Sequence, residues 1–163
     1  MADLVSHDIL VPTDFRPGSR AALERAVRSL GPEGGTICVL HVIDQTLLGQ
    51  VQALLPEVTE TELQQRFRQQ AEAQYAALVA DLDCGSATVE PFIISGKPFV
   101  KIVQLARDLD VDMIVMTVHR GATHVEQFLF GSTAERVLRL APCPVLIVPE
   151  TPAAQADNHV AEG

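Results

Sequence analysis

The sequence lacks the features that would place it in a membrane or send it out of the cell. Its longest unbroken apolar runs are only a few residues long, far short of the ~20 apolar residues that a membrane-spanning helix needs. The N-terminal stretch MADLVSHDILVPTDF has no basic region and no long apolar core, so no secretory signal peptide is expected. We therefore predict a cytoplasmic protein without a membrane partner.

Basic residues are also scarce. Twelve Lys+Arg stand against 21 Asp+Glu, which gives a formal net charge of −9. Such a chain repels DNA, RNA and anionic membrane surfaces, so no nucleic-acid partner is expected. One small anionic ligand, held locally by backbone N–H groups, remains compatible with this charge.

Motifs for metal-dependent or nucleophilic chemistry are absent as well. Cys38, Cys84 and Cys143 are odd in number, far apart and not arranged as CxxC, which favours buried structural thiols over disulfides or a zinc site. There is no metal-ligand spacing, no nucleophile elbow and no Walker A pattern. We predict no metal site, no catalytic residues and at most slow hydrolysis of a bound nucleotide.

What the sequence does contain is a regular alternation of strand and helix patterns. The chain has 163 residues, 47% of them hydrophobic, which suits one domain with a buried core over residues 1–150, followed by a flexible acidic tail over 151–163. Alternating strands and helices, with several continuously apolar strands, predict an α/β three-layer sandwich: a parallel sheet covered by helices on both faces. Strands are expected at 7–14, 36–44, 86–95, 111–118 and 143–149, and helices at 16–30, about 60–85, 96–110 and 132–140.

Three further details of this pattern lead to predictions. Pro91 in the third strand indicates an edge position or a bulge. Phe99, Ile102, Val103, Ala106 and Leu109 are expected to face inward from the helix that has Pro98 in its first turn. The apolar segment 45–58 follows no clear period; it could be a lid, a second dimer contact or core, and we favour core or lid packing.

Ligands of open parallel sheets bind at the carboxyl ends of the strands, where the strand order reverses. Three stretches are expected to meet there: Pro12-Thr13-Asp14, Val42-Ile43-Asp44, and the loop from Thr117 to Ser132. Gly131-Ser132 opens a helix, where free N–H groups and the helix dipole can bind an anion. The same residues, Ser132-Thr133-Ala134-Glu135, also fit a capping box that needs no ligand.

Two other side chain types in these stretches have alternative roles. Asp14 can accept hydrogen bonds from a ribose or can cap the turn that follows it. His119 and His124 can contact phosphates or can be solvated loop side chains.

Three blocks of the sequence, ILVPTDF, LHVID and GSTAERVLRLAPCPVLIVP, together resemble the universal stress protein family. The resemblance extends from about residue 7 to 149. It implies an adenine nucleotide alpha-hydrolase-like fold, with the five-stranded parallel sheet in the order 3-2-1-4-5. It also implies a homodimer formed through the last strand.

One branch of this family binds ATP through the pattern G-x-x-G-(nine residues)-G-[S/T]. By resemblance, Pro12, Thr13 and Asp14 lie around the adenosine, and Val42 borders the adenine. Gly121, Gly131 and Ser132 are placed at the phosphates, with His119 and Thr133 beside them. ATP is thus the expected ligand, with another adenine nucleotide as an alternative.

The loop departs from this pattern at its first glycine. Counting back from Gly121, that glycine is replaced by Val118; an alignment on His119 instead places Thr117 there, in a loop one residue longer. Two readings follow: a stress-response module that binds ATP, or a nucleotide-free interaction module whose loop is closed by Val118 or Thr117. A third, an enzyme that makes a nucleotide or adenylates a substrate, is disfavoured because the short chain has no second domain.

Overall fold

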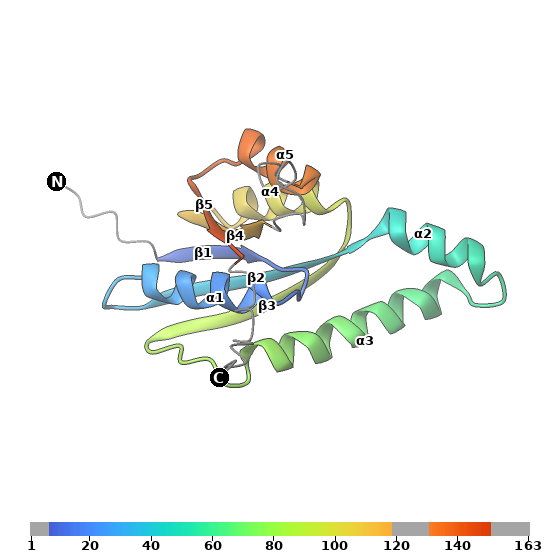
Figure 1. Ribbon diagram of the computed structural model, residues 1–163, viewed down its shortest axis with the longest axis horizontal. Coiled ribbons are helices and arrows are strands. Elements are labelled where there is room, and N and C mark those ends of the chain that lie inside the picture. The colour runs from blue at the N-terminus through green and yellow to red at the C-terminus, as the bar shows by residue number, and fades with distance from the viewer. Residues whose placement is uncertain (1–6, 119–130, 151–163) are drawn as a thin grey trace, which may run out of the picture.

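The computed structural model describes residues 7–118 and 131–150, so the predicted tail over 151–163 lies outside the described part. Strands and helices alternate along this part, except that two helices follow one another after the second strand (Figure 1). The elements are β1 (Asp8–Pro12), α1 (Gly18–Ser29), β2 (Gly35–Asp44), α2 (Gln45–Leu54), α3 (Glu60–Val79), β3 (Ala87–Gly96), α4 (Pro98–Asp108), β4 (Met113–Val118), α5 (Ser132–Leu140) and β5 (Val145–Pro149).

The five strands form one sheet in the order β3-β2-β1-β4-β5, and every neighbouring pair is parallel. This confirms the predicted α/β sheet and its strand order. The strand that contains Pro91 lies at one edge, as its proline indicated, and β5 lies at the other. The order reverses at β1, which has β2 on one side and β4 on the other, so this is the switch point of the sheet.

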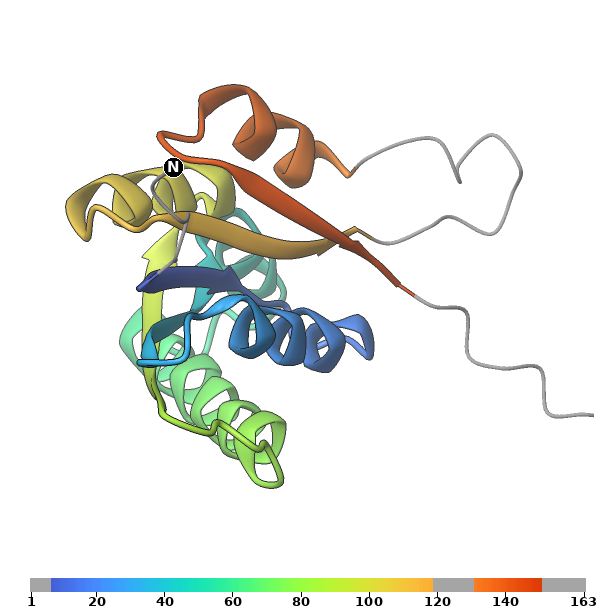
Figure 2. The same ribbon diagram turned by 90° about the vertical axis from the view of Figure 1, so that its left-hand side faces the viewer.

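Side chains that alternate along the strands build two separate cores, one on each face of the sheet. Leu10 and Leu40 point into a cluster with α4 and α5, whereas Ile9 and Val39 point into a cluster with α1 and the end of α3. Figure 2 shows the sheet between these helices. The central strands are therefore buried on both faces, which explains why they read as continuous apolar runs.

The prediction of buried structural thiols is confirmed only in part. Cys38 is buried on β2, and burial, with smaller contributions from the nearby Glu90 and Asp8 carboxylates, raises the pKa of its thiol to about 11. This thiol is neutral at physiological pH and acts as a small apolar side chain. Cys84 and Cys143 are only half-buried, and all three are free.

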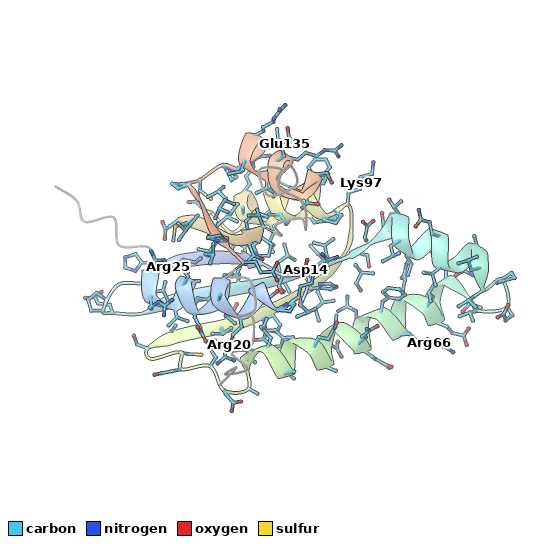
Figure 3. The ribbon with its side chains drawn as sticks, viewed as in Figure 1. Asp14, Arg20, Arg25, Arg66, Lys97 and Glu135 are labelled. Atoms are coloured by element: carbon cyan, nitrogen blue, oxygen red, sulfur yellow. The ribbon has the colours of Figure 1, made fainter. Side chains whose placement is uncertain are left out.

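The predicted long helix ends earlier than expected. The sequence pattern predicts a helix that ends at about Gly85, whereas α3 ends at Val79. The Asp83 side chain accepts the Gly85 N–H (3.1 Å), a local turn that competes with continued helix. The guanidinium of Arg20 on α1 also donates to two carbonyls at this end of α3, those of Leu78 (2.8 Å) and Asp81 (2.7 Å) (Figure 3).

Residues 45–54 of the segment 45–58 form helix α2, and the predicted core packing is confirmed only for Leu48 and the partly buried Val51 and Val58. Of its leucines only Leu48 is buried, in a small cluster with Ile43 and Leu63, while Leu54 is 80% exposed. Among the described residues, none of α2 lines the cavity described below. Figure 1 shows α2 and α3 as an arm that continues from β2 beyond the body of the sheet.

Helix α4 begins as predicted, with Pro98 in its first turn. Ile102, Val103 and Ala106 are buried, but Leu109 is 37% exposed and does not face inward. The reason is that the helix ends at Asp108, and Asp110 with φ of 49° turns the chain before the next strand.

Asp112 ties the start of β1 to the start of β4. Its carboxylate accepts the N–H groups of Asp8 (3.0 Å) and His7 (2.7 Å), and these two hydrogen bonds hold its pKa below the usual value. A depressed pKa stabilises the folded state above the unfolded-state pKa of about 3.9, and this contribution is lost as the pH falls through the folded-state pKa.

Asp112→Asn is therefore expected to lower the free energy of unfolding at pH 7 by less than about 1 kcal/mol, because the carboxylate is exposed. The difference from the wild type is expected to vanish at a pH below the lowered folded-state pKa of Asp112. Urea unfolding at several pH values measures it. A difference that stays constant down to that pH would contradict the charged hydrogen bonds as its cause.

Candidate functional site

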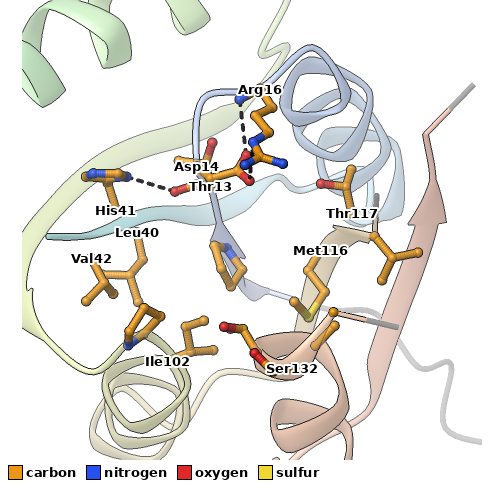
Figure 4. A pocket seen from close by; sticks show the side chains of 16 residues that line it. Thr13, Asp14, Arg16, Leu40, His41, Val42, Ile102, Met116, Thr117 and Ser132 are labelled. Carbon is orange, nitrogen blue, oxygen red and sulfur yellow. Dashed lines mark hydrogen bonds and ion pairs between the residues drawn. The ribbon is translucent and has the colours of Figure 1, made fainter. Parts of the chain in front are cut away.

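A cavity of about 340 Å³ lies at the carboxyl edge of the sheet, at the switch point beside β1 (Figure 4). This volume falls in the range of small-molecule sites. The strands β1, β2 and β4 end at the cavity, and helices α4 and α5 begin there. Its lining residues are Pro12, Thr13, Asp14, Arg16, Leu40, His41, Val42, Pro98, Ile102, Met116, Thr117, Val118, Gly131, Ser132, Thr133 and Ala134.

The turn after β1 carries the acidic side of the cavity. Thr13 Oγ1 accepts the Phe15 N–H (3.0 Å), and the Asp14 carboxylate accepts the Arg16 N–H (3.1 Å). Arg16 Nε also lies 3.6 Å from the Asp14 carboxylate. Asp14 therefore caps the turn, one of its two predicted roles, and remains about half exposed beside the cavity.

The end of β2 brings a backbone edge to the same place. Pro12, the last residue of β1, pairs with Leu40, and the Thr13 N–H donates to the Leu40 carbonyl (2.8 Å). Peptide groups alternate sides along a strand, so Val42 presents its N–H and C=O to the same side as Leu40. Because β1 ends at Pro12, opposite Leu40, no described strand pairs with the Val42 N–H and C=O on this side, and they face the cavity.

The helices that begin at the cavity differ from those of the arm. The residues before α4 and α5, Lys97 and Gly131, make no side-chain cap hydrogen bond. By contrast, α2 is capped by Asp44 and α3 by a capping box of Thr59 and Glu62. Within residues 7–118 and 131–150, no side-chain cap thus occupies the first N–H groups of α5, which lie at the cavity.

The predicted capping box of Ser132 and Glu135 does not form. Ser132 is the first residue inside α5, one position too late to act as the N-cap, and the Glu135 carboxylate instead pairs with Arg139 one turn later (2.8 Å). The capping box is therefore not confirmed among the described residues.

Neither its backbone conformation nor its packing against the described residues requires position 131 to be a glycine. Its φ of −59° suits any residue, and nothing among the described residues lies within 4 Å of where its Cβ would be. Gly34 and Gly96, by contrast, have positive φ and close neighbours. Among the described residues, the glycine at this helix start therefore leaves room for a ligand to approach the backbone.

Val118 and Thr117, which replace the first loop glycine, form part of the cavity wall. Val118 packs on the core cluster beneath α4 and α5, and the Thr117 methyl lies against Gly18 of α1. The cavity exists with both side chains in place.

Nine of the eleven predicted site residues line this one cavity, and the other two, His119 and Gly121, lie outside the described residues. Sequence reasoning missed several lining residues. His41 and Met116 directly precede predicted residues and Leu40 lies two positions before Val42, so the strand ends themselves could have indicated them. Pro98 opens a helix at the same edge, but nothing in the sequence marked Arg16. The missed residues are Arg16, Leu40, His41, Pro98, Ile102, Met116 and Ala134.

Within residues 7–118 and 131–150, no group of three or more His, Cys, Asp or Glu side chains is placed to hold a metal ion. No helix in that part of the chain is long and apolar enough to cross a membrane.

The strand order and the position of the cavity define a doubly wound α/β protein with its candidate site at the switch point. Residues 6–149 match the model of the universal stress protein family, and the chain belongs to this family. It is 33% identical over 153 residues to universal stress protein MJ0577 of Methanocaldococcus jannaschii, covering 86% of this chain and 93% of that protein.

Solved structures agree with this assignment. The structure of MJ0577 superposes with a TM-score of 0.75 at 29% identity, covering 91% of this chain and 99% of that one. A universal stress protein in complex with cAMP (TM-score 0.57, 21% identity, 90% and 99% covered) shares the fold. So does one from Archaeoglobus fulgidus in complex with dAMP (0.61, 18%, 88% and 98%).

Proposed function

We propose that this protein is a cytoplasmic stress-response module that binds an adenine nucleotide, ATP in the first place, in the cavity beside β1. The observation that carries the proposal is the start of α5. There, Gly131 and Ser132 bring backbone N–H groups to the cavity, and no side chain of the described residues caps them or fills the space at Gly131. Such a helix start favours a phosphate.

The rest of the cavity suits a nucleoside. Adenine offers an N–H donor and a ring-nitrogen acceptor side by side, and the Val42 peptide offers a matching acceptor and donor at the β2 edge. Asp14 can accept hydrogen bonds from ribose hydroxyls. Leu40, Ile102 and Met116 supply apolar contacts for the flat base. Complexes of two proteins of this fold with cAMP and dAMP support an adenine nucleotide as the first ligand to test.

The direct experiment is mass spectrometry of the small molecules released when the purified protein is denatured, followed by titration with ATP, AMP and cAMP. Released or titratable ATP supports the proposal. Tighter binding of AMP or cAMP would keep an adenine nucleotide but replace ATP. No ligand and no affinity would favour the alternative, a nucleotide-free interaction module closed by Val118 or Thr117.

Binding, and not turnover, is the proposed role of this nucleotide, which would act by shifting the conformation or the partners of the module. Phosphate and pyrophosphate release in the presence of Mg²⁺ and ATP tests this point. Turnover at rates of about 1 s⁻¹ or faster, in the range of ordinary enzymes, would overturn it.

The module is proposed to be a homodimer through β5. The two edges of the sheet differ: β3 carries Glu90 and Pro91, which discourage pairing, whereas β5 is the short apolar run VLIVP with half-buried side chains. Leu138 and Leu140 on the preceding helix are 40% and 52% exposed. Pairing of β5 with its two-fold mate would cover an open, apolar edge.

Val145→Pro tests this interface. The Pro144 carbonyl accepts the Ile114 N–H (2.9 Å), so this C=O points toward β4. The Val145 N–H belongs to the same trans peptide group and therefore points the opposite way, out from the edge of the sheet. Proline there removes an outward donor without breaking the β4 ladder. Light scattering is expected to give twice 17.6 kDa for the wild type and 17.6 kDa for the variant. Val145→Thr, which keeps the N–H, should remain dimeric; a monomeric wild type would exclude this dimer.

A further inference from the structure

The turn that carries Asp14 contains a strained residue. Phe15 has a φ of 61°, in the left-handed region that bulky side chains avoid. Such a conformation persists only where the surroundings hold it. Two local hydrogen bonds contribute, from the N–H of Phe15 to Thr13 Oγ1 and from the N–H of Arg16 to the Asp14 carboxylate. Both lie inside the turn, so neither fixes its position relative to the cavity.

His41 adds a side-chain contact to the two backbone hydrogen bonds that reach the turn from outside, from the Thr13 N–H to the Leu40 carbonyl and from the Ser19 N–H to the Arg16 carbonyl. Its Nδ1 lies 3.0 Å from the Thr13 carbonyl oxygen (Figure 4). A carbonyl can only accept, so Nδ1 carries the proton. The His41 ring also lies against the Phe15 ring, with centroids 4.7 Å apart and planes tilted by 33°. One side chain thus holds both the backbone before Asp14 and the side chain after it.

The position of His41 in β2 links the turn to the backbone edge at Val42. Leu40 and Val42 direct their side chains into the core beneath α4 and α5, so His41 between them projects from the opposite face of the sheet. From there it reaches the turn from beneath, while the next peptide, that of Val42, faces the cavity. The same two residues of β2 therefore set the position of the turn and present the backbone edge.

We infer that His41 is a positioning residue for the nucleotide site: it holds the Thr13–Arg16 turn so that the Asp14 carboxylate stays in register with the Val42 edge. This inference rests on the proposed nucleotide site. His41 lines the cavity, and its described contacts are with the Thr13 backbone and the Phe15 ring, so the role assigned to it is to position the turn. The requirement is a donor at the Nδ1 position.

The test compares two substitutions that differ in that donor. His41→Asn keeps an N–H donor at nearly the place of Nδ1, whereas His41→Leu keeps apolar bulk without a donor. Amide hydrogen exchange of Phe15 and Arg16 is measured in the ligand-free protein, and ATP affinity by titration. Exchange is expected to be about tenfold faster, and affinity about 3- to 10-fold weaker, in His41→Leu, as the loss of one hydrogen bond implies. His41→Asn should restore both to within about twofold of the wild type.

Three results would overturn the inference: wild-type exchange in His41→Leu, unchanged ATP affinity in His41→Leu, or equal losses in both variants. The last would mean that only the shape of the ring matters. A wild type that binds no nucleotide overturns the proposed function instead. In that case amide exchange in the ligand-free protein still decides whether His41 holds the turn, so the two failures are distinguishable.

Discussion

Replacing Gly131 by valine is expected to weaken ATP binding about 10- to 100-fold, since each lost hydrogen bond between a backbone N–H and a charged phosphate costs about 1.5–3 kcal/mol. The added side chain would stand where a phosphate must approach the first turn of α5. In the ligand-free protein it meets no described atom within 4 Å and adopts an allowed φ. The melting temperature should therefore change little.

Gly49→Val is the matched control for this experiment. Gly49 lies on the exposed face of α2, also with nothing within 4 Å of its Cβ, and away from the cavity. Titration calorimetry and thermal unfolding of both variants separate binding from folding. Equal ATP affinity in the Gly131 variant and the wild type would contradict a phosphate site at α5.

Gly35→Ala is expected to have the opposite signature, with a large loss of stability and no direct effect on the ligand. A Cβ at Gly35 would penetrate the carbonyl oxygen of His7, a backbone atom that also accepts the Thr36 N–H (2.7 Å). The backbone cannot move away without breaking the pairing of β1 with β2. Overpacking of this kind costs about 2–4 kcal/mol.

Thermal unfolding measures this loss, and a cost of that size should lower the melting temperature by roughly 5–15 °C. Gly49→Ala is the control for the generic effect of replacing glycine. There an open helical position should become more stable by about 0.5–1 kcal/mol. A Gly35→Ala protein as stable as the wild type would show that the start of β2 yields more easily than the packing indicates.

The sequence predicted the sheet well because strands buried on both faces leave an unambiguous apolar signal. The apolar runs around Leu10 and Leu40 are short and are separated by helix patterns, so they predict buried strands. The segment 45–58 was harder because its apolar residues serve two purposes. Leu48 fills a small cluster and Leu54 faces solvent, so no single period describes them.

At the site, sequence reasoning found the residues that end strands and missed those that depend on the turn between them. The topology rule places Thr13 and Val42 at one edge without any knowledge of side-chain contacts. Arg16 and His41 enter through a left-handed Phe15 and a hydrogen bond across 28 positions in the sequence. The capping box at Ser132 failed by one position: Gly131 is the N-cap of α5, and Glu135 pairs with Arg139 on the helix surface.

The arm formed by α2 and α3 determines where we expect local unfolding of the native protein. Its outer part is held by the small cluster of Ile43, Leu48 and Leu63, whereas the sheet has two larger clusters. Local opening costs least where few apolar contacts are lost. We therefore expect the amides of α2 to exchange through a partial unfolding that leaves β1 and the cavity intact, so that one chain combines a rigid binding edge with a separately melting extension.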